Sequence, residues 1–421
     1  MIKLVKMMAA AIIVLFAASC SAGTHPPFPK DAELILDIGY TNEQHFNQRY
    51  SNLLAIEYPN MQFNIFATKG LIQSEQPAEW LRDHPVDLIY VPSSRIKQFV
   101  EEGLLAEIDS LIKRDQLELD QFVPAVVELS KEYGNGKLYG LPSNFYGRAI
   151  VYNQDLFDKY DVAYPTDQMS WEELLQLAGK FTRSESESSD LKGLSLSYSS
   201  PFALIQQIGT TEGLQFFNDQ EQVTFNSSSW AAVWGHVLSA YEAGSLDFNP
   251  DLNTYLSPFL TGERAMVVIS YEEYKRIEQE KPAFNWSTVT VPVNPAEPER
   301  SSEMRIPGMY AITAVADDQE TAWELLKFLV SEEAARWDHR PNDGFSTRLN
   351  QLTMDPSAQE KIQSFYKLTP AVPEDHAELP AEIADISQEI TDQIFSRSIS
   401  LPEGLDTLQQ AAEQAWENRT N

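Results

Sequence analysis

The sequence predicts an α/β protein that contains more than one domain. Segments with the residue pattern of strands alternate with segments with the pattern of helices, an order that is typical of parallel sheets covered by helices. A second series of the same kind begins after residue 190. The chain of 421 residues is also long enough for two or three domains, at roughly 150 residues each.

The first series is predicted to begin with a strand at 33–40, ELILDIGY. A helix follows at 42–60, because apolar residues recur there at helical spacing. Apolar runs at 61–68 and 86–92 predict two more strands, and a helix at 95–103 ends at Gly103, a residue that suits the position after a helix. The apolar residues of the first helix are Phe46, Tyr50, Leu53, Leu54 and Ile56.

The middle of the chain, 137–157, predicts two short apolar strands around a turn. A helix follows at 169–182, where Ser170 and Glu173 have the spacing of a capping box. The polar run RSESESSD is predicted to be a surface loop.

The second series continues with alternating strands and helices. A final helix is predicted to begin at Asp317, with Glu320 completing a capping-box-like start, and the acidic tail is predicted to be helical. The predicted strands and helix between these points lie at 191–200, 227–244 (helix), 264–270, 287–293 and 308–316.

The only cysteine, Cys20, directly follows an apolar run and two small residues. Lys3 and Lys6 precede that run, which is too short to span a bilayer. The stretch FAASC resembles a bacterial lipobox, with residues 1–19 as the signal peptide, acyl chains such as palmitate on the sulfur, and 20–31 as a proline-rich tether. An ordinary signal peptide, a retained anchor or a free thiol are the alternatives. The predicted location is the outer side of the cell membrane, or the periplasm, with the lipid as the only membrane contact.

The composition is strongly acidic, with 62 acidic and 31 basic residues. Removal of the leader lowers the net charge from −31 to −33, because the leader contains two lysines and no acid. Such a chain is repelled by nucleic acid and by anionic lipid headgroups. The charge favours solubility, and acidic patches that dock a basic partner are the alternative.

Motifs for catalysis are absent from the sequence. It contains no GxGxxG, P-loop, HExxH or GxSxG motif, and its six histidines share no metal-ligand spacing. No cofactor or metal is therefore predicted. The informative residues are aromatic and polar ones that follow strands, because ligand crevices in open α/β sheets lie outside the carboxyl ends of strands. They are Tyr40, Ser93, Ser94, Arg95, Tyr271, Tyr274, Met309 and Tyr310. An aromatic ring offers a flat face to a sugar ring, whereas core packing is the alternative role for each of them.

Five segments in order resemble family 1 extracellular solute-binding proteins, the binding components of ABC importers, a group that includes maltose-binding protein. These segments are 86–112, 133–157, 170–182, 262–268 and 344–348. The resemblance implies the two-lobed fold of periplasmic-binding-protein type, class II, with a central ligand cleft and crossing hinge strands. It implies a first lobe of 32–145 and 296–330 and a second lobe of 146–295 and 331–421.

The resemblance also implies a hinge and further cleft residues. The crossing from Ser143 to Arg148 would be the first connection between the lobes, the chain would return near 295–309, and it would leave the first lobe again near Val330. Phe145, Gly147 and Arg148 are the expected hinge residues. The expected ligand contacts also include Asn144, Tyr146 and Phe345.

The expected function is capture of a small solute, most simply a mono- or oligosaccharide, by a lipid-anchored monomer that delivers it to ABC permease subunits. The protein itself would catalyse no reaction. The alternatives are an extracellular enzyme that acts on polysaccharide and a ligand sensor of the same fold without a permease.

Overall fold

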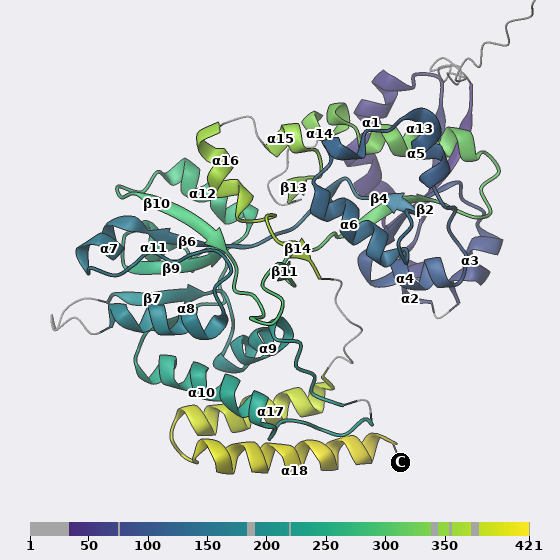
Figure 1. Cartoon of the computed structure of the whole chain (residues 1–421). Coiled ribbons are helices and arrows are strands. Elements are labelled where there is room, and N and C mark those ends of the chain that lie inside the picture. Colours follow the sequence, from purple (N-terminus) through teal and green to yellow (C-terminus); the bar gives the residue numbers. More distant parts are fainter. Residues whose placement is uncertain are drawn as a thin grey trace, which may run out of the picture.

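The computed structural model describes residues 33–74, 76–182, 190–218, 220–337, 344–352, 356–371 and 379–420. They form two lobes, each built on one five-stranded sheet, with several chain segments between them (Figure 1). Cys20, the predicted signal peptide and the whole of the predicted tether lie outside the described residues. No helix in the described part of the chain is long and apolar enough to cross a membrane.

The first lobe contains a mixed sheet of order β2-β1-β3-β12-β4. Strand β1 pairs in parallel with β2 and β3, and β12 runs antiparallel to β3 and β4. The strands are β1 (Ile35–Tyr40), β2 (Gln62–Ala67), β3 (Leu88–Pro92), β4 (Gly140–Leu141) and β12 (Gly308–Ile312). The helices are α1 (Glu43–Glu57), α2 (Lys69–Gln73), α3 (Pro77–Asp83), α4 (Ser93–Glu101), α5 (Asp109–Asp115), α6 (Pro124–Tyr133) and α13 (Gln319–Leu329), with a 3₁₀ turn at Leu119–Gln121.

The second lobe contains a mixed sheet of order β10-β6-β9-β7-β8. Strands β7, β8 and β9 are parallel, and β6 runs antiparallel to β9 and β10. The strands are β6 (Ala149–Asn153), β7 (Lys192–Leu196), β8 (Leu246–Phe248), β9 (Arg264–Ile269) and β10 (Trp286–Thr290). The helices are α7 (Gln154–Lys159), α8 (Trp171–Ala178), α9 (Pro201–Thr211), α10 (Ser228–Glu242), α11 (Ser257–Leu260), α12 (Tyr271–Glu280), α17 (Ala381–Phe395) and α18 (Leu401–Thr420), with a 3₁₀ turn at Gly179–Phe181.

Short strands and helices connect the lobes. Strand β5 (Asn144–Phe145) pairs with β13 (Phe345–Ser346), and β11 (Arg300–Ser301) pairs with β14 (Thr369–Pro370). Helices α14 (Glu332–Trp337), α15 (Leu349–Leu352) and α16 (Pro356–Gln363) complete this region.

One apolar core is continuous between the two sheets. It contains Val91 of β3 and Ile269 of β9, together with Phe145 and Phe345 of the crossing strands. The rings of Phe145 and Phe345 stack with centroids 5.1 Å apart. Burial of large apolar side chains therefore holds the crossing segments together, since such burial is the main favourable contribution to folding.

The predicted lobe boundaries remain a prediction, and the structure adds detail within them. The sequence assigned 331–421 to the second lobe. In the structure Ala334 of α14 lies in the first lobe's core, whereas Thr288 of β10 donates a hydrogen bond from Oγ1 to the Lys361 carbonyl of α16 at 2.7 Å. The segment thus contacts the first lobe before it reaches the second.

Several local predictions can be compared directly with the structure. The Ser170–Glu173 capping box is confirmed, and Gly103 follows α4 with a positive φ of 67°. The capping box predicted at Asp317 is wrong, because Asp318 caps α13 by accepting a hydrogen bond from the Thr321 backbone. Ile56 was placed on the buried face of α1 but is 66% exposed.

Candidate functional site

The two sheets each place the ends of parallel strands beside the crossing segments. In the second lobe, β7, β8 and β9 end at Leu196, Phe248 and Ile269, and the antiparallel β6 begins at Ala149 opposite Ile269. Side chains just beyond these ends therefore share one edge of the sheet, the position at which open α/β sheets bind ligands.

Arg148 lies at the centre of this edge in the second lobe. It donates from Nη2 to Ser197 Oγ at 3.1 Å and from Nη1 to Tyr198 OH at 3.4 Å. Because β6 and β7 lie on opposite sides of β9, the Arg148 side chain reaches across the end of β9. A long, planar guanidinium with five donors can make both contacts and still offer further donors.

Two carboxylates influence the pKa of Arg148. Burial acts to lower the Arg148 pKa, but the negative charges of Glu303 and Glu273 act against it, and the net effect is a raised pKa. Glu273 is already engaged in the cap of α12, where it accepts a hydrogen bond from the Ser270 backbone at 2.7 Å. Burial is also the main cause of the raised pKa of Tyr198. Arg148 is therefore cationic and Tyr198 is a neutral phenol at physiological pH.

At the matching edge of the first lobe, strand β3 ends at Pro92 and helix α4 begins at Ser93. The Ser93 backbone donates to the Pro307 carbonyl at 3.1 Å. Arg95 donates from Nη2 to the Ser74 carbonyl, while its Nε is buried without a hydrogen-bond partner in the described structure. From the sequence, a surface ion pair was an alternative role for Arg95. No ion pair of Arg95 is present among the described residues.

A crossing segment contacts both edges. Arg305 and Tyr146 exchange two backbone hydrogen bonds, of 2.8 and 3.0 Å, and the Arg305 guanidinium lies 5.7 Å from the centroid of the Tyr146 ring. Two residues after Arg305, the Pro307 carbonyl accepts the hydrogen bond from the Ser93 backbone. This segment thus joins the Arg148 side of the site to the α4 side.

Gly147 has a packing reason rather than a conformational one. A Cβ at this position would lie 2.4 Å from the Phe365 carbonyl oxygen, and Gly147 does not have a positive φ. The crossing segment therefore needs glycine at position 147, because the backbone at Phe365 approaches it closely. A hinge role for Phe145, Gly147 and Arg148 stays a prediction.

Many of the aromatic residues predicted to contact ligand are packed in cores. Tyr310 shares a hydroxyl–hydroxyl contact with Tyr50 at 2.5 Å, and its ring stacks on Tyr40 with centroids 6.4 Å apart. In this conformation such buried side chains offer little surface to a solute, and their role as ligand contacts stays a prediction. The predicted contacts that are buried are Tyr40, Asn144, Tyr274, Met309, Tyr310 and Phe345.

The other predicted contacts remain partly or fully exposed. Tyr271 is partly buried, and its ring centroid lies 4.0 Å from that of Phe345, which brings together two residues predicted from distant segments. Ser94 is exposed, and Ser93, Arg95 and Tyr146 are partly buried.

The sequence reasoning did not identify Ser197, Tyr198 or Glu303. A signal for the first two was present, since they directly follow the strand 192–196 and obey the same strand-end rule. Glu303 follows no strand end in the sequence pattern, because it lies in a crossing segment whose position depends on the fold.

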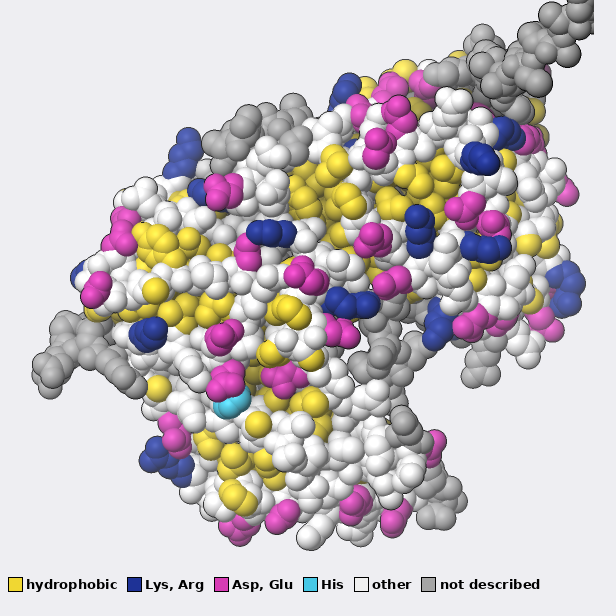
Figure 2. All heavy atoms as spheres, in the orientation of Figure 1, with side chains coloured by type: hydrophobic (Ala, Val, Ile, Leu, Met, Phe, Trp, Pro, Cys, Tyr) yellow, Lys and Arg dark blue, Asp and Glu magenta, His cyan; other side chains and the backbone are white. Residues whose placement is uncertain are grey.

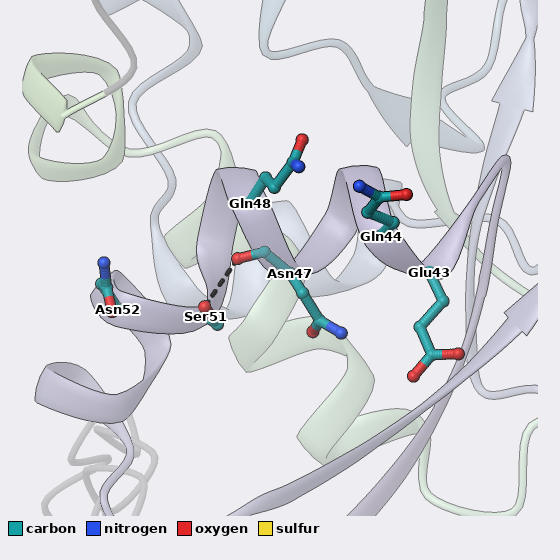
Figure 3. A pocket seen from close by; sticks show the side chains of 6 residues that line it. All are labelled: Glu43, Gln44, Asn47, Gln48, Ser51 and Asn52. Carbon is teal, nitrogen blue, oxygen red and sulfur yellow. Dashed lines mark hydrogen bonds between the residues drawn. The ribbon is translucent and has the colours of Figure 1, made fainter.

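A shallow pocket on α1 is a weaker candidate (Figure 3). Its lining comes from one helix face, and the Ser51 hydroxyl donates to the Asn47 carbonyl at 2.6 Å. The lining has no aromatic ring and all of its side chains are exposed. Those residues are Glu43, Gln44, Asn47, Gln48, Ser51 and Asn52. Within the described residues no group of three or more His, Cys, Asp or Glu side chains could hold a metal ion.

Comparisons with known proteins agree with this geometry. Residues 42–336 match the family model described as bacterial extracellular solute-binding protein. A putative binding protein of Brucella abortus (strain 2308) is 23% identical over 274 residues, 62% of this chain and 61% of the relative, so the match spans about three fifths of that relative's length.

Solved structures cover nearly the whole chain. A family 1 extracellular solute-binding protein from Alicyclobacillus acidocaldarius has a TM-score of 0.66 at 14% identity, covering 90% of this chain and 98% of that one. The sugar-binding protein MalE of Xanthomonas citri has a TM-score of 0.61 at 13% identity, covering 92% and 98%. The substrate-binding protein Lmo0181 of Listeria monocytogenes has a TM-score of 0.55 at 17% identity, covering 92% and 100%. These likenesses confirm the predicted two-lobed fold of periplasmic-binding-protein type.

Proposed function

Because the chain belongs to the family of bacterial extracellular solute-binding proteins, we propose that it captures a carbohydrate between its lobes and delivers it to an ABC permease. The observation that supports this most is the group at the edge of the second lobe. Arg148, Ser197 and Tyr198 combine a guanidinium, a hydroxyl and a phenol beside the crossing segments. Such groups satisfy sugar hydroxyls, while an aromatic ring covers the apolar face of the sugar.

Similar structures support the solute class. Lmo0181 was solved with cycloalternan, a solute-binding protein of Agrobacterium radiobacter K84 with ribitol, and a cyclo/maltodextrin-binding protein with maltotetraose. All three ligands are carbohydrates or polyols. These ligands therefore support a carbohydrate or polyol as the solute of this protein.

The mechanism would be closure of the two lobes around the solute. A solute that contacts Arg148 on one lobe and the start of α4 on the other binds the closed form better, and it shifts the population by that difference in affinity. The permease would then recognise the closed, loaded monomer. A lipid on Cys20 would hold the protein at the outer face of the membrane, close to that permease.

A binding screen with one variant tests the carbohydrate proposal. Thermal-shift and calorimetric titrations should identify a binding mono- or oligosaccharide, because ligand at about 100 times its Kd stabilises the protein by roughly 2.7 kcal/mol. Tyr198→Ala should weaken that binding about tenfold, since it removes a ring and a hydrogen-bond partner. Tyr164→Ala is the matched control, because Tyr164 is 40% exposed on the same lobe and donates to Asp158 instead. Binding of no carbohydrate, or equal loss in both variants, would contradict the proposal.

A further inference from the structure

Arg148 has only neutral oxygen partners. Its two hydrogen bonds go to the hydroxyls of Ser197 and Tyr198, and within the described residues no carboxylate oxygen lies within 4.0 Å of it. The side chain is partly buried, so its charge is only partly hydrated. The charges of Glu303 and Glu273 offset the desolvation cost from a distance, and a carboxylate in direct contact with Arg148 would offset it further.

Several other partly or fully buried arginines of this protein pair with carboxylates. Arg264 lies 2.8 Å from Asp247, and Arg114 lies 2.7 Å from Asp115. Pairing is easy in a chain with twice as many acidic as basic residues. Figure 2 shows acidic side chains spread over both lobes of one face, interspersed with basic ones.

Arg148 has no such carboxylate partner among the described residues, and neither have Arg276 and Arg348, which donate to backbone carbonyls. Arg148 differs from these two because its partners are side-chain hydroxyls just beyond a strand end.

Two more arginines near the site lack a close carboxylate among the described residues. They are Arg95 of α4 and Arg305 of the crossing segment. Arg305 pairs through its backbone with Tyr146, two residues before Arg148, and Pro307 pairs with Ser93, two residues before Arg95. These backbone contacts connect the segments that carry the three arginines.

We propose that the natural solute is an acidic carbohydrate whose carboxylate, as in a uronic acid, binds Arg148. This inference rests on the proposed function and narrows its solute class. A planar guanidinium matches a carboxylate through two parallel hydrogen bonds, and Arg148 still has donors to offer.

Glu303 gives the proposal a second, independent test. Its charge raises the Arg148 pKa, yet it is too distant for an ion pair. The incoming carboxylate would approach the guanidinium while repelled by Glu303. Removal of the Glu303 charge should therefore strengthen binding of an acidic sugar and leave binding of a neutral sugar unchanged.

The experiment compares sugars that differ only in the acidic group. Isothermal titration would use D-galacturonate against D-galactose, D-glucuronate against D-glucose, and digalacturonate against the corresponding neutral disaccharide. We expect the acidic members to bind at least about tenfold more tightly. Arg148→Gln should weaken the acidic members by about tenfold to a hundredfold and the neutral members by much less, because the neutral sugars lose only a hydrogen bond. Arg148→Lys should weaken the acidic members less, and Glu303→Gln should tighten them.

Controls separate this inference from the proposed function. Arg397→Gln removes the same charge from the outer surface of the second lobe, where Arg397 pairs with Glu242, and should change neither class of sugar. The melting temperature of each unliganded variant checks its fold. Equal or tighter binding of the neutral members, or tighter binding of galactose 6-sulfate than of galacturonate, would overturn the inference while carbohydrate binding stands. If no member of any pair binds, the carbohydrate proposal falls as well.

Discussion

Asp115 is the most heavily stabilised carboxylate described in the first lobe. Its oxygens accept hydrogen bonds from Arg114 Nε at 2.7 Å, Trp323 Nε1 at 2.7 Å and Lys327 Nζ at 2.9 Å. The hydrogen bond from Arg114 is the largest cause of its depressed pKa, and Lys327 and Trp323 add to it. A carboxylate with three donors stabilises the folded state only while it is ionised.

Asp115→Asn should therefore lower the free energy of unfolding by about 2–3 kcal/mol at pH 7. The folded pKa lies below the unfolded value of roughly 3.9, so this contribution is fully present above about pH 4 and declines as the pH falls further. Urea denaturation at pH 7 and at pH 3 would show the difference between the two proteins shrink. Asp406→Asn, at an exposed position of α18, is the control and should have no such effect. A constant difference at both pH values would contradict this account.

At the residue scale, the strand-end rule selected candidate residues from the sequence. Ser93 and Arg95 follow the end of β3, as the rule requires, and Tyr198 could have been found by the same rule, but contact of Ser93 and Arg95 with a ligand stays a prediction. The rule could not separate contact residues from core residues, because burial depends on partners far away in the chain. Tyr310, for example, is buried against Tyr50, which lies 260 positions earlier.

The helix pair α9 and α10 packs unusually closely at one glycine. A Cβ on Gly209 would lie 2.1 Å from Cη2 of Trp230, a side chain that is 1% exposed. Gly209→Ala should gain up to about 1 kcal/mol of helix propensity but lose more to the clash, for a net loss of about 1–2 kcal/mol. Gly235→Ala in α10 is the matched control. Its nearest neighbour would be 3.9 Å away, so it should stabilise the protein by about 0.5–1 kcal/mol. Thermal unfolding of both variants checks the opposite signs, and stabilisation by Gly209→Ala would refute the packing argument.

At the scale of helices and strands, the sequence predicted features that depend on neighbouring residues. It did not predict features that depend on contacts with distant segments. The Ser170 capping box is a contact between neighbours in sequence, so the sequence could predict it. The break between α13 and α14 was not predicted. The Val330 carbonyl accepts a hydrogen bond from Arg348 Nε at 2.6 Å, and Ser331 Oγ accepts one from the Ala334 backbone at the start of α14. The Arg348 contact comes from a later segment. Similarly, the two strands predicted around a turn at 137–157 belong to different sheets, because the chain crosses between the lobes there.

At the scale of the whole molecule, two lobes were predictable because the sequence contains two α/β series and resembles a two-lobed family. The continuous core under the crossing strands was not predictable, since it joins residues from both sheets. The backbone contacts that connect Arg148, Arg305 and α4 through one crossing segment likewise form only on folding.

Anchoring at Cys20 is a prediction about the whole exported protein. Cys20→Ser should release the protein from membranes or leave it unprocessed, because the acyl chains supply the membrane affinity. Detergent partitioning and intact mass would measure both effects. An unmodified thiol on mature, exported protein would show that the anchor is absent.

Lobe closure is the prediction that connects the fold to the proposed function. A saturating sugar that contacts both lobes binds the closed form better, so it should reduce the radius of gyration measured by small-angle scattering. Gly147→Ala should reduce the closed fraction at saturation, because its Cβ would meet the Phe365 carbonyl in the crossing. Tyr198→Ala should lower affinity and closed fraction together, whereas Tyr164→Ala should leave both unchanged. If a tightly bound sugar leaves the scattering profile of the unsubstituted protein unaltered, the solute is bound without closure, and the mechanism is wrong even though the fold is right.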